Sequence, residues 1–72
     1  MDRTGAIAEL RVQAGRAEHT VVRQRLLDLA GEAEAESRAD ALIAADVRTW
    51  AHREGATTGR QRLLEAAGVI EG

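Results

Sequence analysis

The residues of this chain whose type and spacing could do chemistry are its arginines, and they recur in one arrangement. Arg-Gln-Arg-Leu-Leu stands at residues 23–27 and again at residues 60–64. The chain contains arginines but no lysine. On a helix, Arg25 and Arg62 point about 200° away from Arg23 and Arg60, which start beside the leucines. A guanidinium group binds phosphate or carboxylate oxygens through two parallel hydrogen bonds. The arrangement therefore indicates either phosphate contacts or internal ion pairs.

Each of these four arginines has an acidic residue that it can reach. For Arg23 and Arg60 one interpretation is an ion pair at the edge of the core, since a buried guanidinium needs a partner. For Arg25 and Arg62 the acid three residues later allows an exposed pair of about 0.2–0.5 kcal/mol, and the alternative is contact with phosphates or base edges. The expected pairs are Glu9–Arg23, Asp46–Arg60, Arg25–Asp28 and Arg62–Glu65.

Nothing else in the chain has the spacing of a catalytic or metal-binding motif. His19 and His52 are the only histidines, there is no cysteine, and Gly55 and Gly59 lack the remainder of a nucleotide-binding loop. The serine and threonine residues show no nucleophile elbow or triad spacing. We therefore expect no enzyme activity, no cofactor, no metal ion and no small-molecule substrate.

Two stretches of the chain repeat one pattern. Residues 8–31 aligned with residues 45–68 are identical at 12 of 24 positions. A repeated structural unit is the economical explanation, and we expect two helical hairpins that pack on each other. The predicted organisation is a single helical domain, 1–72, with repeat 1 at about 4–31, an acidic spacer at 32–36 and repeat 2 at about 37–70.

The elements of these repeats are predicted to be helices. The chain has no proline, and its apolar residues recur at spacings of three and four. We expect an all-α domain of four helices at about 4–17, 20–30, 37–54 and 58–67. Gly31 and Gly68 are predicted to end the second and fourth helices. Residues 37–40 and 58–61 are predicted capping boxes at the starts of the third and fourth.

The predicted core consists mainly of small aliphatic side chains. Trp50 is the only aromatic residue, and we expect it in the core or in a dimer interface. A chain of this size without disulfides buries little apolar area, so we expect a homodimer or a complex with another helical protein. The other residues expected to face inward are Ala6, Ile7, Leu10, Ala14, Ala17, Val22, Leu26, Leu27, Ala30, Leu42, Ile43, Val47, Leu63 and Leu64.

The charge of the chain is small in sum and uneven in distribution. The formal net charge is −2, but residues 32–46 hold five acidic side chains against one arginine. No stretch approaches the about 20 apolar residues of a membrane span, and the first residues lack the apolar run of a signal peptide. We expect a cytoplasmic protein without membrane contact.

Two segments resemble the helix-turn-helix domains of DNA-binding proteins such as site-specific recombinases. They are residues 19–31, with His-Thr-Val-Val-Arg-Gln-Arg-Leu-Leu and Ala-Gly, and residues 47–69, with Ala51, Gly55 and Thr-Thr-Gly-Arg-Gln-Arg-Leu-Leu. In that family a small polar start leads to exposed arginines and buried leucines. Glu54 and Gln61 depart from the pattern, which has apolar residues there. The resemblance implies DNA contacts by Arg48, Arg53, Thr57, Thr58, Arg60 and Arg62.

Two functions follow from these observations. One is a small, dimeric, helix-turn-helix-like regulator of transcription that binds DNA. The other is a helical protein–protein interaction or dimerisation module with no nucleic-acid or catalytic role. The orientation of Arg25 and Arg62 discriminates between them. An exposed, net-positive surface favours DNA, whereas neutralisation by Asp28 and Glu65 favours the module.

Overall fold

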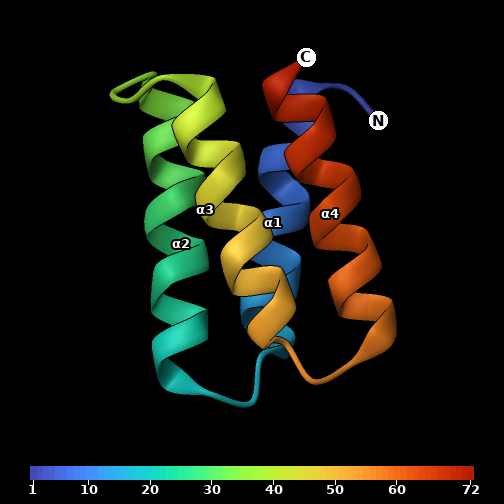
Figure 1. Cartoon of the computed structure of the whole chain (residues 1–72). Coiled ribbons are helices and arrows are strands. Elements are labelled where there is room, and N and C mark those ends of the chain that lie inside the picture. Colours follow the sequence, from blue (N-terminus) through green and yellow to red (C-terminus); the bar gives the residue numbers. More distant parts are fainter.

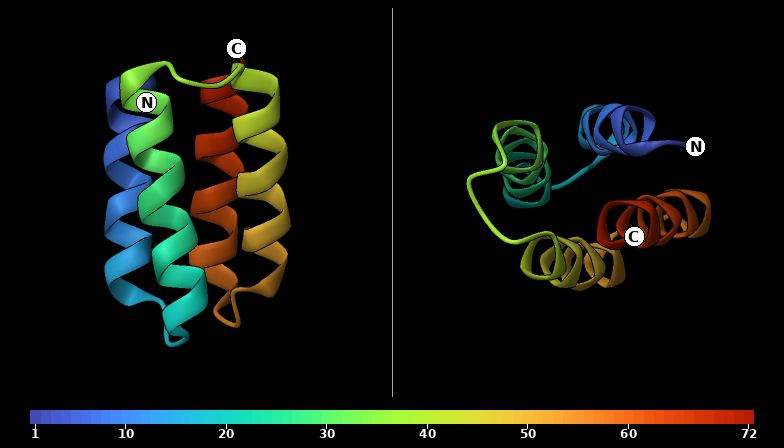
Figure 2. Two further views of the ribbon diagram at one scale, coloured as in Figure 1. Left: turned by 90° about the vertical axis from the view of Figure 1, so that its left-hand side faces the viewer. Right: turned by 90° about the horizontal axis from the view of Figure 1, so that it is seen from above.

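Four antiparallel helices form a bundle. The computed structural model describes all 72 residues, with α1 at Arg3–Arg16, α2 at Thr20–Ala35, α3 at Asp40–Arg53 and α4 at Thr57–Glu71. The helices stand at the corners of a square (Figures 1 and 2), and α1 packs against both α2 and α4. The predicted all-α, four-helix fold is confirmed. There is no strand.

The two hairpins have matching boundaries and matching contacts. α1 and α3 each contain 14 residues, and Asp40 follows Arg3 by the same 37 positions that separate Thr57 from Thr20. Within the first hairpin Arg11 pairs with Glu34 at 3.1 Å. The equivalent pair in the second hairpin joins Arg48 to Glu71 at 2.9 Å. The helix starts and the ion pair that clamps each hairpin are therefore repeated at the same 37-residue offset as the sequence pattern.

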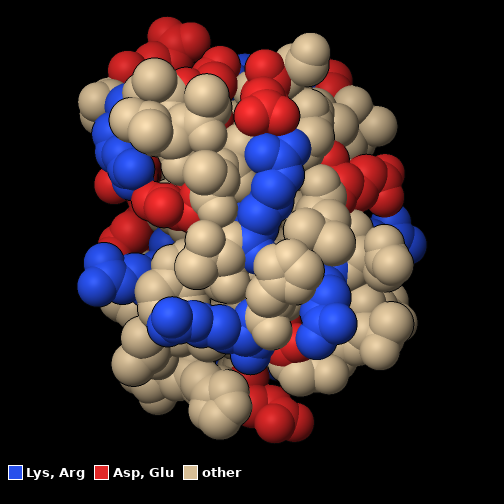
Figure 3. Space-filling model, viewed as in Figure 1, with Lys and Arg blue, Asp and Glu red and all other residues tan.

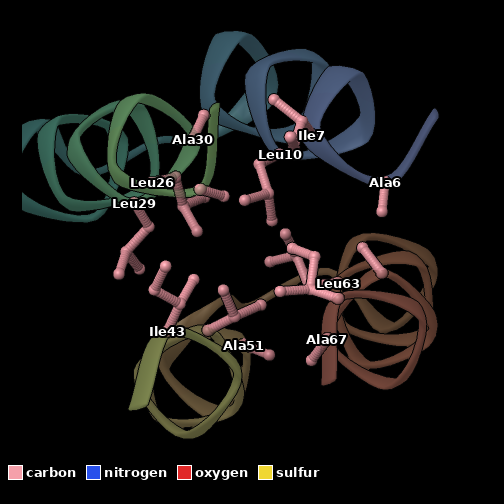
Figure 4. Close-up of a cluster of buried hydrophobic side chains, with 14 of the residues drawn as sticks. Ala6, Ile7, Leu10, Leu26, Leu29, Ala30, Ile43, Ala51, Leu63 and Ala67 are labelled. Carbon is pink, nitrogen blue, oxygen red and sulfur yellow. The ribbon is translucent and has the colours of Figure 1, made fainter. Parts of the chain in front are cut away.

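The core is built as much from alanine as from larger side chains. Nine of the 18 buried hydrophobic residues are alanines, and all lie at 3% exposure or less. Small side chains allow helices to approach closely, while each buries little area. Leucine and isoleucine side chains from all four helices meet between them (Figure 4). The largest fully buried side chains are Leu10, Leu26, Ile43, Val47, Leu63 and Ile70.

Two predicted helix ends are wrong, because the helices continue through their glycines. α2 passes Gly31 and ends at Ala35, and Glu36 takes the left-handed conformation with φ 54°. α4 passes Gly68 and ends at Glu71. The residues after each glycine remain helical because one of them is buried, Ala33 at 0% and Ile70 at 2% exposure. Most of the predicted acidic spacer is thus the last turn of α2.

The two predicted capping boxes are also wrong. Ala39 precedes α3 and Ala56 precedes α4, and neither helix start has a side-chain cap. Only α1 is capped in this way, where the Gly5 amide donates to Asp2 Oδ1 at 2.8 Å. The starts of α3 and α4 therefore follow from the packing of their apolar faces and not from local capping chemistry.

Two leucines expected in the core lie at the surface. Leu27 is 40% exposed and Leu42 is 56% exposed. Trp50 and Leu64 are partly buried against the core. The remaining residues predicted to face inward are buried. Leu27 and Leu42 stand beside the buried Leu26 and Ile43, at the edge of the apolar stripe.

The continuation of the helices through glycine gives a test of the fold. A Cβ atom added at Gly31 or Gly68 meets nothing within 4 Å, and glycine inside a helix costs about 0.5–1 kcal/mol relative to alanine. We expect Gly31→Ala and Gly68→Ala each to raise the free energy of unfolding by about that amount, measured by urea denaturation followed by far-ultraviolet circular dichroism.

Gly59→Ala is the matched control. Its Cβ would lie 3.2 Å from Gln13 Oε1 and 3.3 Å from Glu54 Cγ, so we expect a smaller gain or a loss. Destabilisation by Gly31→Ala or Gly68→Ala would contradict the observed helix ends.

Candidate nucleic-acid interface

The fold sorts charge along the axis of the bundle. We call residues 10–27 and 47–64 the loop end, because they surround the α1–α2 and α3–α4 connections. We call residues 1–9, 28–46 and 65–72 the terminal end. The loop end holds eight arginines and two acidic residues, net +6, and the terminal end holds two arginines and ten acidic residues, net −8. Figure 3 shows acidic side chains along the upper margin and arginines across the middle and lower part of one face.

Ion pairs involve only four of the ten arginines. Arg3 pairs with Asp40 at 2.9 Å, and Arg38 joins Glu32 at 2.8 Å to Asp46 at 3.0 Å. Arg11 and Arg48 form the two hairpin clamps. Every arginine without a carboxylate partner lies at the loop end, and these six are Arg16, Arg23, Arg25, Arg53, Arg60 and Arg62. The positive charge of this end is therefore largely uncompensated.

The predicted pair Glu9–Arg23 is wrong. Glu9 accepts a hydrogen bond from Gln13 Nε2 at 2.6 Å. Arg23 Nη2 donates to the Ala17 carbonyl oxygen at 3.3 Å. This guanidinium satisfies a carbonyl at the end of α1 while keeping its charge free.

The predicted pair Asp46–Arg60 is wrong in the same way. Asp46 is taken by Arg38, and Arg60 Nη2 donates to the Glu54 carbonyl oxygen at 3.4 Å. Arg60 is half-buried, and its Nε has no hydrogen-bond partner. The Arg60 contact repeats the Arg23 contact in the second hairpin.

Arg25 and Arg62 are exposed, and neither forms an ion pair with the acid three residues later. Asp28 instead accepts from Gln24 Nε2 at 2.9 Å. Arg25 Cζ lies 5.8 Å from the Trp50 ring centroid, within cation–π distance. The two arginines stand on different helices at the same end of the bundle.

All six predicted contact residues belong to the loop end, and five of them take part in no ion pair. Arg53 ends α3 with its Cζ 4.7 Å from the Trp50 centroid. Thr57 and Thr58 are exposed in the first turn of α4, one turn before Arg60 and Arg62. Arg48 does not join them, because its guanidinium is held by Glu71 towards the terminal end.

Three of the six unpaired arginines, Arg16, Arg23 and Arg25, are absent from the predicted contact residues. Arg16 is the last residue of α1 and is exposed without a partner. The only signal for it was its equivalence to Arg53 across the 37-residue offset. Arg25 was considered, but its place beside Arg53 and Trp50 depends on the packing of α2 against α3.

The geometry differs from that of a helix-turn-helix unit. In such units two helices cross at about 90–120°, whereas α3 and α4 lie side by side in opposite directions (Figure 1). The loop end instead presents the N-termini of α2 and α4, neither of which has a side-chain cap. Free amide groups at a helix start favour anions, and here they lie among unpaired arginines.

The structure contains no group of three or more histidine, aspartate or glutamate side chains placed to hold a metal ion. None of the four helices combines the length and the apolar character that crossing a membrane requires.

The hairpin clamps predict a pH dependence with a built-in control. Hydrogen bonds and then charge attraction from Arg11 lower the pKa of the Glu34 carboxyl, and Arg48 lowers the pKa of Glu71 likewise. Because the folded pKa lies below the unfolded value, the stabilisation is present above the ordinary glutamate pKa of about 4.3 and is lost as the pH falls through the folded pKa. We expect NMR titrations of the side-chain carboxyl carbons to show lowered pKa values for both Glu34 and Glu71.

Arg11→Gln should return the pKa of Glu34 towards its ordinary value and leave that of Glu71 lowered. Arg48→Gln should do the reverse. Equal movement of both pKa values in either variant would show that the two clamps are not independent contacts.

No protein-family model, no curated protein and no solved structure matches this chain.

Proposed function

We propose that this protein is a small regulator that binds DNA through the loop end of the bundle. The observation that supports the proposal is the gathering of all six unpaired arginines at that end, in a chain whose net charge is −2. Arginine is well suited to phosphate, because its planar fork of donors can bind two oxygens at once. A duplex offers such phosphates in two closely spaced rows.

The contacts are to the phosphate backbone more than to base edges. The molecule measures 27 × 19 × 17 Å, so the loop end is wider than the about 12 Å major groove. The end also presents helix termini and no helix that can lie along the groove floor. Hydroxyl groups of Thr57 and Thr58 and the amides of the first turn of α4 can donate to a phosphate beside Arg62.

The acidic terminal end sets the orientation of binding. With a charge of net −8 it is repelled by the duplex, whereas the loop end is attracted. Charge separation of this kind steers a molecule during its approach and weakens as salt screens it. The modest total charge is thus no obstacle to a directed contact.

A protein-interaction module remains the second candidate, favoured by exposed apolar side chains. Val21 is 60% exposed and Leu42 is 56% exposed. Val21 and Leu42 lie on α2 and α3, whereas Arg16 and Arg62 lie on α1 and α4, so variants of these two arginines distinguish the two functions. Binding of a protein in place of DNA would leave Arg16 and Arg62 without effect.

We expect a fluorescein-labelled duplex to bind at low salt, with the logarithm of affinity falling linearly as the logarithm of salt concentration rises. Arg16 and Arg62 are exposed and have no side-chain partner. Arg16→Gln/Arg62→Gln should weaken binding to all sequences alike. Its salt slope, measured by fluorescence anisotropy, should be smaller by about 2.

Thr4→Glu/Ala41→Glu is the charge-matched control. It also lowers the net charge by two, but in the exposed first turns of α1 and α3 at the terminal end, where acidic residues suit the helix dipole. It should change affinity far less than the arginine variant. Equal losses in the two variants, or no binding at low salt, would refute the proposal.

A further inference from the structure

The joint between α2 and α3 is the open side of the bundle. These neighbours pack less extensively than the other three adjacent pairs. A groove of about 520 Å³ lies over the joint, and its lining includes Arg25, Asp28, Glu32, Asp46 and Trp50. The adjacent helix pair with the least extensive packing therefore also carries a groove on its surface.

Two apolar side chains extend the rows of residues that line this groove. On α2, Arg25, Asp28 and Glu32 succeed one another at spacings of three and four, and Val21 stands one turn before Arg25. On α3, Leu42 stands one turn before Asp46 in the same way. Val21 at 60% and Leu42 at 56% are the most exposed large hydrophobic side chains of the molecule. Both therefore belong to one outer face, which we call the α2–α3 face.

Charge changes sign along the α2–α3 face. Its half at the loop end carries Arg25 and Arg53, neither of which has a carboxylate partner. Its half at the terminal end carries Asp28, Glu32 and Asp46 on the groove wall, with Arg38 held between the last two. A basic half thus adjoins an acidic half on one continuous surface.

We propose that the α2–α3 face binds a second copy of this chain in an antiparallel, twofold-symmetric dimer. A twofold axis through the middle of the face places the basic half of each copy against the acidic half of the other. The same patch serves both copies, so the assembly closes as a dimer. A parallel pairing would place like charges together, which opposes it.

The size of the face suits such a contact. A standard stable interface buries about 800 Å² per partner, roughly a fifth of the 4171 Å² surface of this molecule. The long dimension of 27 Å is available along the face. Half of the buried hydrophobic residues are alanines, so the core buries little apolar area. Burial of Val21, Leu42 and the exposed part of Trp50 in a dimer adds to that area.

Two double variants with opposite charge changes test the arrangement. Arg25→Glu/Arg53→Glu makes the whole face acidic. Asp28→Arg/Glu32→Arg makes its terminal half basic, because both residues line the groove, while Arg38 keeps Asp46 as its partner. Sedimentation equilibrium should show a wild-type dimer that weakens with salt. Each variant alone should have a dissociation constant more than about a hundredfold higher.

An equimolar mixture of the two variants should restore the dimer, because each acidic half then meets a basic half. Restoration also shows that both variants are folded. Arg16→Glu/Arg62→Glu carries the same charge change on α1 and α4, away from the face, and should dimerise like the wild type. The fluorescence emission of Trp50, the only tryptophan, should shift over the same range of dilution in which the dimer dissociates.

A monomeric wild type up to millimolar concentration would overturn the proposal, as would a dimer that survives in both variants. A wild-type dimer whose variants fail to combine would overturn the antiparallel arrangement. No DNA is present in these experiments, so their outcome is independent of the DNA-binding proposal.

Discussion

The structure depends on burying four narrow apolar stripes whose members are small. Alanine supplies half of the buried hydrophobic residues, so stabilisation comes from close approach of the helices and little from large buried side chains. The radius of gyration, 10.4 Å, is slightly below the about 11 Å typical of a chain this long. Neither hairpin can cover its stripe alone, and α1, which packs on both α2 and α4, holds the two together. Narrow stripes also leave most of each helix surface to charged residues. How those charges are placed then decides what the molecule can bind.

The number of helices and the starts of three of them were predictable because they depend on local periodicity, which recurs after 37 residues. The third helix begins at Asp40, three residues after its predicted start. The ends of the second and fourth helices were not predictable. Gly31 and Gly68 have the form of stop signals, but a stop also requires that the following residues gain nothing from staying helical. Ala33 and Ile70, buried beyond the glycines, reverse that balance through contacts with distant segments. Leu27 and Leu42 were wrongly predicted to be buried for a related reason, since each stands at the edge of its stripe, where burial depends on the neighbouring helix.

At the loop end, the features that depend on neighbouring residues were predictable, and those that depend on how the chain folds back were not. The recurrence of Arg-Gln-Arg correctly indicated where α2 and α4 begin. Arg53, at the end of α3, lies with Arg60 and Arg62 at the loop end. The predicted pairs Glu9–Arg23 and Asp46–Arg60 also cross a hairpin but join the wrong residues, whereas the actual clamps join Arg11 to Glu34 and Arg48 to Glu71. Charge sorting arises only when the chain doubles back. Alternate helices run in opposite directions, which collects arginines from residues 10–27 and 47–64 at one end.

The position of the chain ends has a consequence for topology. Both termini and the loop between α2 and α3 lie at one end of the bundle (Figure 1), and α1 and α4 are packed neighbours. A short peptide joining Gly72 to Met1 and a new opening near Ser37 would therefore produce a circularly permuted chain, in which the second hairpin is synthesised first. Since each hairpin carries its own clamp, the rearranged polypeptide should reach the same bundle. The order of the hairpins along the backbone would then be incidental to the architecture.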